Sequence, residues 1–260
     1  MGARAIWKAE LHLGDETVPV KLYSAVQDRN IHFKLLHEVD EVPLQQRRVN
    51  PLTDETVPYE ATRRAFEAQR DLFVVLDEDE LASAEPEPSR AITVTRFVDP
   101  SLINHQWYER PYYLGPDGHE DDYFALAEAL AGQNKEGVAR WTMRGKGYVG
   151  ALRAEGAYLM LIALRSADEI IPAAELEPPS GRALAKEELK LAEQLIDALA
   201  GEFHPEDFRD EYRHRVKELI EAKLEGKKLP TRKYEPEPAV GSLSASLKAS
   251  LKKAGLKRAG

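Results

Sequence analysis

Short segments rich in β-branched and aromatic residues recur along the first 164 residues of the chain. Several are separated or ended by turn sequences, namely GDET, GPDG and AEG. Short strands joined by such turns predict an antiparallel barrel or sandwich. The predicted strands are residues 5–13, 18–26, 71–77, 91–98, 106–114, 137–143, 148–153 and 157–164. A further run at residues 31–39 does not decide between strand and helix.

Helical patterns occur at two places within this strand-rich part and dominate after Pro172. Residues 77–84 begin with acids that complement a helix dipole, and residues 121–130 are amphipathic, with Gly132 placed to end the helix. After a linker at 177–181, one apolar stripe predicts a helix over 183–200. A second helix is predicted over 207–226. Pro205, just before this range, is well placed for a first helical position. The whole pattern is that of an α+β protein.

Charge is segregated along the chain, which holds 36 Lys and Arg against 45 Asp and Glu, a formal net charge of -9. Residues 227–260 hold nine basic residues and two acids, a local charge of +7, so residues 1–226 carry -16. A body this acidic repels nucleic acid on average. If it binds DNA, its basic residues must gather on one face. The basic end is rich in Pro, Gly and Ser, so we expect a disordered tail that serves as an attachment point.

Composition excludes several classes of site. The chain has no cysteine, which excludes disulfides, a thiol nucleophile and cysteine-ligated zinc. Its longest apolar run, residues 157–164, is too short to cross a bilayer, and its first ten residues have no apolar signal-peptide core. We therefore expect a cytosolic protein with no membrane partner. Its seven histidines lack a pattern such as HExxH, so we expect no bound metal.

One motif points toward an enzyme. GKGYVG at residues 145–150 matches the glycine pattern of a dinucleotide-binding loop. Such a loop must open a helix, whose N-terminus holds the pyrophosphate. The next residues, ALRAEG, contain a turn instead, which favours an antiparallel hairpin. A nucleotide-dependent enzyme that uses this loop stays the alternative function. Because no Walker or G-x-S-x-G motif occurs, nothing in the sequence demands an enzyme.

Basic residues gather in the acid-free stretch VARWTMRGKGYVGALR, residues 138–153, and in an Arg pair further upstream. Scattered surface charge is the simpler explanation. The functional interpretation is a surface that follows a phosphate backbone, because Arg and Lys on paired strands can contact phosphates without entering a groove. The candidate DNA-binding residues are Lys21, Lys34, Arg47, Arg48, Arg140, Arg144, Lys146 and Arg153.

An ordered series of blocks resembles bacterial Ku, the DNA-end-binding family of non-homologous end joining. The blocks are RAIWKAELHLGDETVPVKLYSAV, RRVNPLTDETVPYE, SRAITVTRFVDPSLI, ERPYYLGPD, MRGKGYVGALR and KEELKLAEQLIDALAGEFHPEDFRDEYRHRVKELIEAKLEGK. The resemblance extends over roughly residues 3–228, and such an ordered series is far more specific than a single motif.

The resemblance implies a homodimer whose two β-barrel cores and bridging arms form a ring that DNA threads from a broken end, independent of sequence. It implies a barrel core with a dimer bridge at residues 1–171, a helical arm at 172–228 that embraces the partner subunit, and a flexible basic tail at 229–260. It implies no catalytic activity and no cofactor, and a place on the bacterial nucleoid in the cytoplasm.

The tail is expected to contact DNA, or to recruit and stimulate the ATP-dependent DNA ligase that completes double-strand break repair by end joining. Its candidate contacts are Lys248, Lys252, Lys253, Lys257 and Arg258. A protein-interaction module that never touches DNA is a third hypothesis, and it predicts no basic channel in the dimer.

The chain departs from the family at one place. Some members carry a Cys-x-x-Cys pair after the basic RRV, where this chain has Asn50 and Thr53. A metal held there in relatives is therefore not expected here, and PLTDET is expected to form an ordinary turn.

Overall fold

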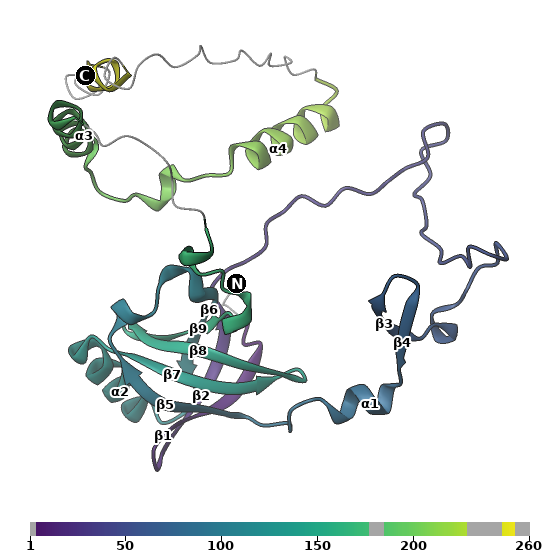
Figure 1. Cartoon of the computed structure of the whole chain (residues 1–260), viewed down its shortest axis with the longest axis horizontal. Helices are drawn as coiled ribbons and strands as arrows, with labels where there is room; N and C mark the ends of the chain where they lie inside the picture. Colours follow the sequence, from purple (N-terminus) through teal and green to yellow (C-terminus); the bar gives the residue numbers. More distant parts are fainter. Residues whose placement is uncertain (1–3, 177–184, 228–245, 253–260) are drawn as a thin grey trace. The chain divides into compact units, whose positions relative to one another are not determined.

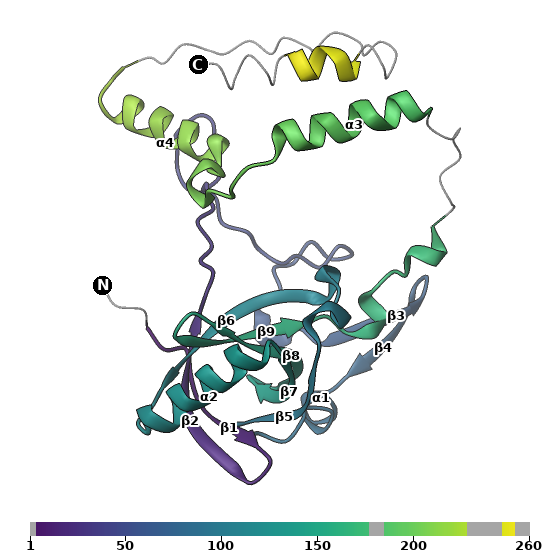
Figure 2. The same ribbon diagram turned by 90° about the vertical axis from the view of Figure 1, so that its left-hand side faces the viewer.

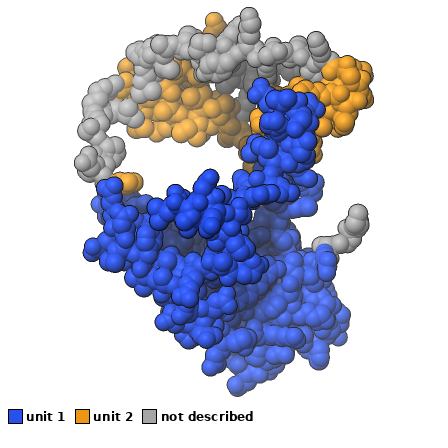
Figure 3. All heavy atoms as spheres, turned by 90° about the vertical axis from the view of Figure 1, so that its right-hand side faces the viewer, with its two compact units in different colours: residues 1–175 blue, residues 176–260 orange. Residues whose placement is uncertain are grey.

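The computed structural model describes residues 4–176, 185–227 and 246–252. It divides into two compact units, residues 1–175 and 176–260, which Figure 3 colours separately. In the described ranges, no helix is long and apolar enough to cross a membrane. The division predicted from the sequence, with boundaries after residues 171 and 228, stays a prediction.

Seven strands of the first unit form a closed barrel (Figure 1 and Figure 2). In order around the wall they are β1 (Trp7–Leu13), β2 (Glu16–Ser24), β6 (Tyr108–Pro116), β9 (Tyr158–Leu164), β8 (Lys146–Glu155), β7 (Glu136–Met143) and β5 (Ala91–Val98). Every neighbouring pair is antiparallel except β1 and β5, whose parallel pairing closes the barrel. The predicted α+β fold with a mainly antiparallel barrel is confirmed.

Side-chain alternation along the strands builds the barrel interior. On β2, Val18, Val20 and Leu22 are buried, and the residues between them face outward. On β9, every second residue from Leu159 to Ala163 is buried in the same way. Successive side chains of a strand point to opposite faces of the sheet. Each strand therefore keeps a second set of residues on the outer wall, where a ligand can reach them.

One helix of the first unit, α2 (Glu120–Gln133), packs against β8 and β9. The hydroxyl group of its buried Tyr123 donates a hydrogen bond to the Leu114 carbonyl oxygen and accepts one of 2.8 Å from the Leu159 amide. The helix ends at Asn134, which has a φ of 47°, and not at Gly132 as predicted. Asparagine tolerates this left-handed conformation and can therefore end a helix.

Residues 25–90 leave the barrel between β2 and β5, and this segment is named the excursion (Figure 1). It contains η1 (Tyr59–Ala61), β3 (Arg64–Gln69), β4 (Leu72–Leu76) and α1 (Glu78–Ser83). β4 and α1 were predicted from the sequence, whereas β3 was not. The sequence of β3, RAFEAQ, has no β-branched residue, and the strand exists because it pairs with β4. Residues 31–39 form no strand or helix beyond one isolated bridge at Leu36.

The predicted turn at PLTDET is confirmed. Val49 and Thr56 form an isolated bridge, and the Asn50 amide donates a hydrogen bond of 2.9 Å to the Glu55 carbonyl oxygen. Among the described residues, no group of three metal-ligating side chains comes together.

The second unit contains α3 (Lys186–Leu199) and α4 (Glu211–Leu224), and residues 246–252 are also helical. Pro205 begins a separate 3-10 turn, η6 (Pro205–Asp207), so the prediction that it begins the long helix is wrong. α4 starts later because the Asp210 carboxylate caps it, accepting a hydrogen bond of 3.0 Å from the Arg213 amide. The predicted linker at 177–181 lies outside the described residues. The remaining 3-10 turns are η2 (Pro100–Leu102), η3 (His105–Trp107), η4 (Ala167–Glu169) and η5 (Ala173–Glu175).

Candidate nucleic-acid interface

The β7–β8 hairpin carries the acid-free basic stretch. Met143 pairs with Lys146, so Arg144 and Gly145 are the two residues of the turn. Both have positive φ, 55° and 73°. Two-residue hairpin turns need such values, which glycine adopts freely, whereas a left-handed residue with a side chain costs roughly 1–2 kcal/mol. The turn therefore places a conformationally strained arginine at the tip of the hairpin.

The same geometry decides the nature of GKGYVG. Its first glycine belongs to the turn, and its other residues lie in β8, which continues to Glu155 where a nucleotide-binding helix would have to run. The interpretation of GKGYVG as a dinucleotide-binding loop is therefore wrong. Gly150 has a packing role, because a Cβ atom there would lie 2.6 Å from the Trp141 ring and 2.7 Å from the Ile162 carbonyl oxygen.

Three of the candidate residues share this hairpin without a compensating acid. Arg140 is exposed on the outer face of β7, between the buried Ala139 and Trp141. In the described ranges no carboxylate lies within ion-pair distance of Arg140, Arg144 or Lys146. These three residues are named the basic hairpin. Their positive charge is available to an external anion.

A surface hollow of about 540 Å³ lies beside Arg140, which lines it together with Arg165, Thr93 and Thr142. The Arg165 guanidinium donates hydrogen bonds to the carbonyl oxygens of Gln106 and Tyr108, at 2.8 and 2.6 Å. Two acids, Glu109 and Glu169, also line this hollow. Cations and hydroxyl groups together suit phosphate oxygens.

A second hollow of about 460 Å³ lies at the tip of the hairpin, lined by Arg144, Gly145 and Arg90 together with Glu85. The Glu85 carboxylate lies against the turn, since a Cβ atom on Gly145 would be 2.7 Å from its Oε2 atom. Sequence reasoning missed Arg90 and Arg165. Each is far from the acid-free stretch in sequence, and only strand pairing brings it beside the hairpin.

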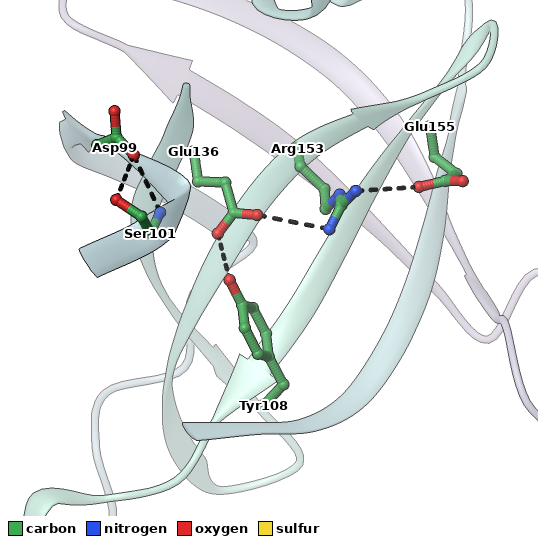
Figure 4. A network of polar contacts seen from close by, with 6 residues as sticks. All are labelled: Asp99, Ser101, Tyr108, Glu136, Arg153 and Glu155. Atoms are coloured by element: carbon green, nitrogen blue, oxygen red, sulfur yellow. Dashed lines mark hydrogen bonds and ion pairs between the residues drawn. The ribbon is translucent and has the colours of Figure 1, made fainter. Parts of the chain in front are cut away.

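Arg153 lies on β8 but in a different electrostatic setting (Figure 4). Its guanidinium lies 3.6 Å from the carboxylates of both Glu136 and Glu155. Glu136 is 2% exposed and accepts a hydrogen bond of 2.6 Å from the Tyr108 hydroxyl. Burial, and then the bond to Glu136, raise the pKa of Tyr108 to about 12. Arg153 thus compensates a buried acid. In the same view, Asp99 accepts two hydrogen bonds from Ser101.

Lys21 is also paired. Its ammonium group lies 2.6 Å from an oxygen of Asp117, whose other oxygen lies 2.9 Å from the ammonium group of Lys8. The hydrogen bond to Asp117 raises the pKa of Lys21, and hydrogen bonds from the two lysines lower the pKa of Asp117.

Lys34, Arg47 and Arg48 lie on the excursion and not on the barrel wall. The Arg48 guanidinium carbon lies 5.1 Å from the ring centroid of Tyr59, a cation–π distance. The structure therefore places four candidates on one hairpin, of which Arg153 is paired with acids, and distributes Lys21, Lys34, Arg47 and Arg48 elsewhere.

Of the tail residues, Lys248 and Lys252 are exposed on the helical segment 246–252, whose Leu247 and Leu251 are partly buried. Lys253, Lys257 and Arg258 lie outside the described residues.

Comparison with known proteins gives one consistent family. The family model of the Ku70/Ku80 beta-barrel domain matches residues 12–191. Non-homologous end joining protein Ku 2 of Geotalea uraniireducens (strain Rf4) is 39% identical over 256 residues, which cover 97% of this chain and 99% of that protein. The Ku proteins of Archaeoglobus fulgidus and Mycobacterium tuberculosis (strain H37Rv) are 34% and 33% identical, over 95% and 96% of this chain and 98% and 95% of their own lengths.

Proposed function

Because the chain belongs to the Ku family, we propose that it binds the ends of double-stranded DNA, independent of base sequence, in non-homologous end joining. The observation that carries this proposal is the basic hairpin on the outer wall of the barrel, with its strained Arg144 and, among the described residues, no carboxylate within ion-pair distance of its three cations. A family of end-joining proteins and a site suited to phosphates point to the same ligand.

Binding would depend on phosphate contacts alone. The hairpin presents guanidinium and ammonium groups on a strand pair and its turn, where they reach a phosphate backbone and not base edges. Affinity should therefore fall steeply with salt and vary little with sequence. The acidic remainder of the body would keep DNA away from other surfaces.

A homodimer supplies the partner surface that several elements lack. β3 and β4 form a two-stranded sheet whose residues are all exposed, among them Phe66 at 66% and Phe73 at 58%. A sheet of only two strands is marginally stable in water. On α3, Ile196 and Leu199 are 69% and 67% exposed. Self-association would bury both sets of apolar side chains.

The tail would act as a recruiting arm for the ATP-dependent DNA ligase of end joining. In the segment 246–252, Leu247 and Leu251 are four residues apart and therefore share one helical face, with Lys248 and Lys252 exposed beside them. Such a helix can dock its apolar face in a groove. In this role the chain holds DNA and ligase together and needs neither a catalytic residue nor a cofactor.

The test compares linear duplex with closed circles of the same sequence in a gel-shift titration at two salt concentrations. We expect binding to the linear form alone, with affinity that falls with salt. The variant Arg144→Glu/Lys146→Glu should lose most of this binding while keeping the dimer mass in size exclusion. Equal binding to circles, or a strong sequence preference at fixed salt, would contradict the proposal.

A further inference from the structure

A third hollow, on another part of the barrel wall, has a different chemistry from the basic hairpin. It encloses about 570 Å³ and is lined by three tyrosines, a glycine and a glutamate, with Leu114 and Pro116 beside them. The strands that form it are β2, β6, β8 and β9. We name it the tyrosine slot, and its principal residues are Tyr23, Tyr113, Gly115, Glu155 and Tyr158.

Strand register explains how the slot forms. Tyr23 and Tyr113 are directly paired across β2 and β6, and Tyr158 is paired with Glu155 across β9 and β8. Gly115 lies two residues after Tyr113, so the same outer row contains a position without a side chain. The Tyr23 ring lies across that position, because a Cβ atom on Gly115 would be 3.1 Å from its Cε2 atom. Aromatic walls thus surround a bare stretch of backbone.

The fold itself leaves these rings accessible. Tyr113 is 39% and Tyr158 is 52% exposed, although the barrel interior is filled by the opposite faces of the same strands. Half-exposed tyrosines that share one hollow are typical of recognition surfaces, because a tyrosine ring offers a large contact area at small entropic cost.

The charge around the slot selects the kind of ligand. Asp117 holds both Lys8 and Lys21, while Glu120 acts electrostatically on Lys21. Arg153 lies between two carboxylates at 3.6 Å each. Glu136 is buried, so the exposed groups of these interactions balance, three acids against three bases: Asp117, Glu120 and Glu155 against Lys8, Lys21 and Arg153. Electron-rich tyrosine faces and a glutamate at the edge suit a cation.

We propose that the tyrosine slot binds an arginine-bearing extended segment of a partner protein. The guanidinium group would lie against the face of Tyr158 or Tyr113 and pair with the Glu155 carboxylate, while the peptide backbone crosses the bare stretch at Gly115. Tyrosines also stack on nucleic-acid bases, but a single strand needs an excess of positive charge for its phosphates, and this surface has none. The site is separate from the basic hairpin and does not depend on DNA binding.

The probe is a fluorescent peptide of alternating arginine and proline, about ten residues long, which is extended before it binds and so loses little entropy. A matched peptide carries citrulline in place of arginine, which keeps the shape and removes the charge. We expect the arginine peptide to bind the full chain in fluorescence anisotropy and the citrulline peptide to bind about tenfold more weakly or worse.

The variants separate the slot from the rest of the fold. Tyr158→Ala should weaken arginine-peptide binding about tenfold, whereas Tyr158→Phe keeps the ring and should bind the peptide as the unchanged chain does. Glu155→Gln should also weaken binding, whereas Tyr59→Ala, an equally exposed tyrosine on the excursion, should have no effect. Binding of linear duplex should be unchanged in the two Tyr158 variants.

Three results would overturn the proposal. The first is equal binding of the arginine and citrulline peptides, and the second is unchanged binding of the arginine peptide by Tyr158→Ala. The third is that the chain binds a thymidine oligonucleotide but not the arginine peptide, and that Tyr158→Ala abolishes the oligonucleotide binding. The last result would identify the slot as a single-strand site.

Discussion

Arg144 occupies a backbone conformation that arginine rarely adopts. Its φ is 55°, and the next residue, Gly145, is at 73° in the same two-residue turn. Asparagine or aspartate followed by glycine is the preferred sequence for such a turn. A residue that costs stability and is not required by the turn is a candidate for function. The charge at the tip of the hairpin is the property that arginine adds.

Replacing Arg144 with asparagine should separate stability from function. We expect Arg144→Asn to raise stability by about 1 kcal/mol, because asparagine tolerates positive φ, and to weaken DNA binding. Thermal unfolding and anisotropy with a linear duplex would measure the two effects. Arg140→Asn is the matched control, since Arg140 lies in a regular strand and should weaken binding with no gain in stability. A loss of stability in Arg144→Asn would show that the arginine side chain supports the turn.

Glu85 limits the positive charge at the same turn. Its carboxylate lies against Gly145, the turn residue that follows Arg144 in the chain, in a hollow that Arg144 also lines. We expect Glu85→Gln to tighten duplex binding several-fold at low salt, with a smaller gain at high salt because screening weakens the repulsion. Glu87→Gln removes the same charge from an exposed position two residues further on. Equal gains from the two variants would mean that only net charge matters.

Tyr108 should make the fold sensitive to alkaline pH. Its pKa is raised from 10.0 to about 12 by burial and by the bond to Glu136, so the folded chain keeps a proton that the unfolded chain loses. The contribution of the protonated Tyr108 to the free energy of unfolding is complete below pH 10 and is lost as the pH rises from 10 to about 12.

Urea unfolding across this range should therefore show a fall in stability that is smaller in Tyr108→Phe. At neutral pH this variant should be less stable by about 1–3 kcal/mol, because Glu136 loses a hydrogen bond while buried. Tyr113→Phe, on the exposed outer wall, is the control and should leave both properties unchanged. An identical pH profile in Tyr108→Phe would assign the alkaline loss to other groups.

At the scale of elements, the β3–β4 hairpin contrasts with the β7–β8 hairpin. The β7–β8 hairpin is held on both sides within the barrel, by β5 and β9, and both of its strands contain buried residues. The β3–β4 hairpin forms a sheet of its own, in which no residue is buried. Exposed apolar strands of this kind invite pairing with another chain.

We expect Phe73→Ser to weaken the dimer by tenfold or more and to leave the thermal stability of the barrel nearly unchanged. The change removes apolar surface that only a partner subunit would bury. Sedimentation over a range of concentrations would measure the dimer. Phe124→Ser on α2 is the control, since Phe124 is 43% exposed but belongs to the barrel unit's own helix. A dimer unaffected by Phe73→Ser would exclude this hairpin from the interface.

At the scale of the whole molecule, charge is divided between an acidic body and a basic end. Residues 1–226 carry -16 and residues 227–260 carry +7. A body with this charge can hold DNA only where its basic residues are concentrated, as on the β7–β8 hairpin.

Deleting residues 233–260 should leave a folded dimer that still loads onto DNA ends. We expect stimulation of the cognate ATP-dependent ligase to fall further than end binding, because the deletion removes the segment 246–252 with its leucine face. Titration with end-labelled duplex and an end-joining assay, each with and without the tail, would measure both. If end binding is largely lost and end joining falls only in proportion, the tail is part of the DNA-binding surface.

The sequence by itself determined the local elements and the family. β2 partly alternates apolar and polar residues, β9 is a short continuous apolar run, and α2 carries its own helical pattern, so each could be predicted from a short window. The basic stretch was visible for the same reason, because Arg140, Arg144 and Lys146 are close in sequence.

Tertiary structure decided everything that depends on pairing between distant segments. It closed the barrel through the parallel contact of β1 with β5, formed β3 against β4, and brought Arg90 and Arg165 beside the basic hairpin. It also turned Arg153 into the partner of the buried Glu136. Side-chain periodicity shows which face of a strand is buried but not which strand lies beside it. The neighbours of a charge, and therefore whether that charge is free to bind a ligand, are settled only when the sheet closes.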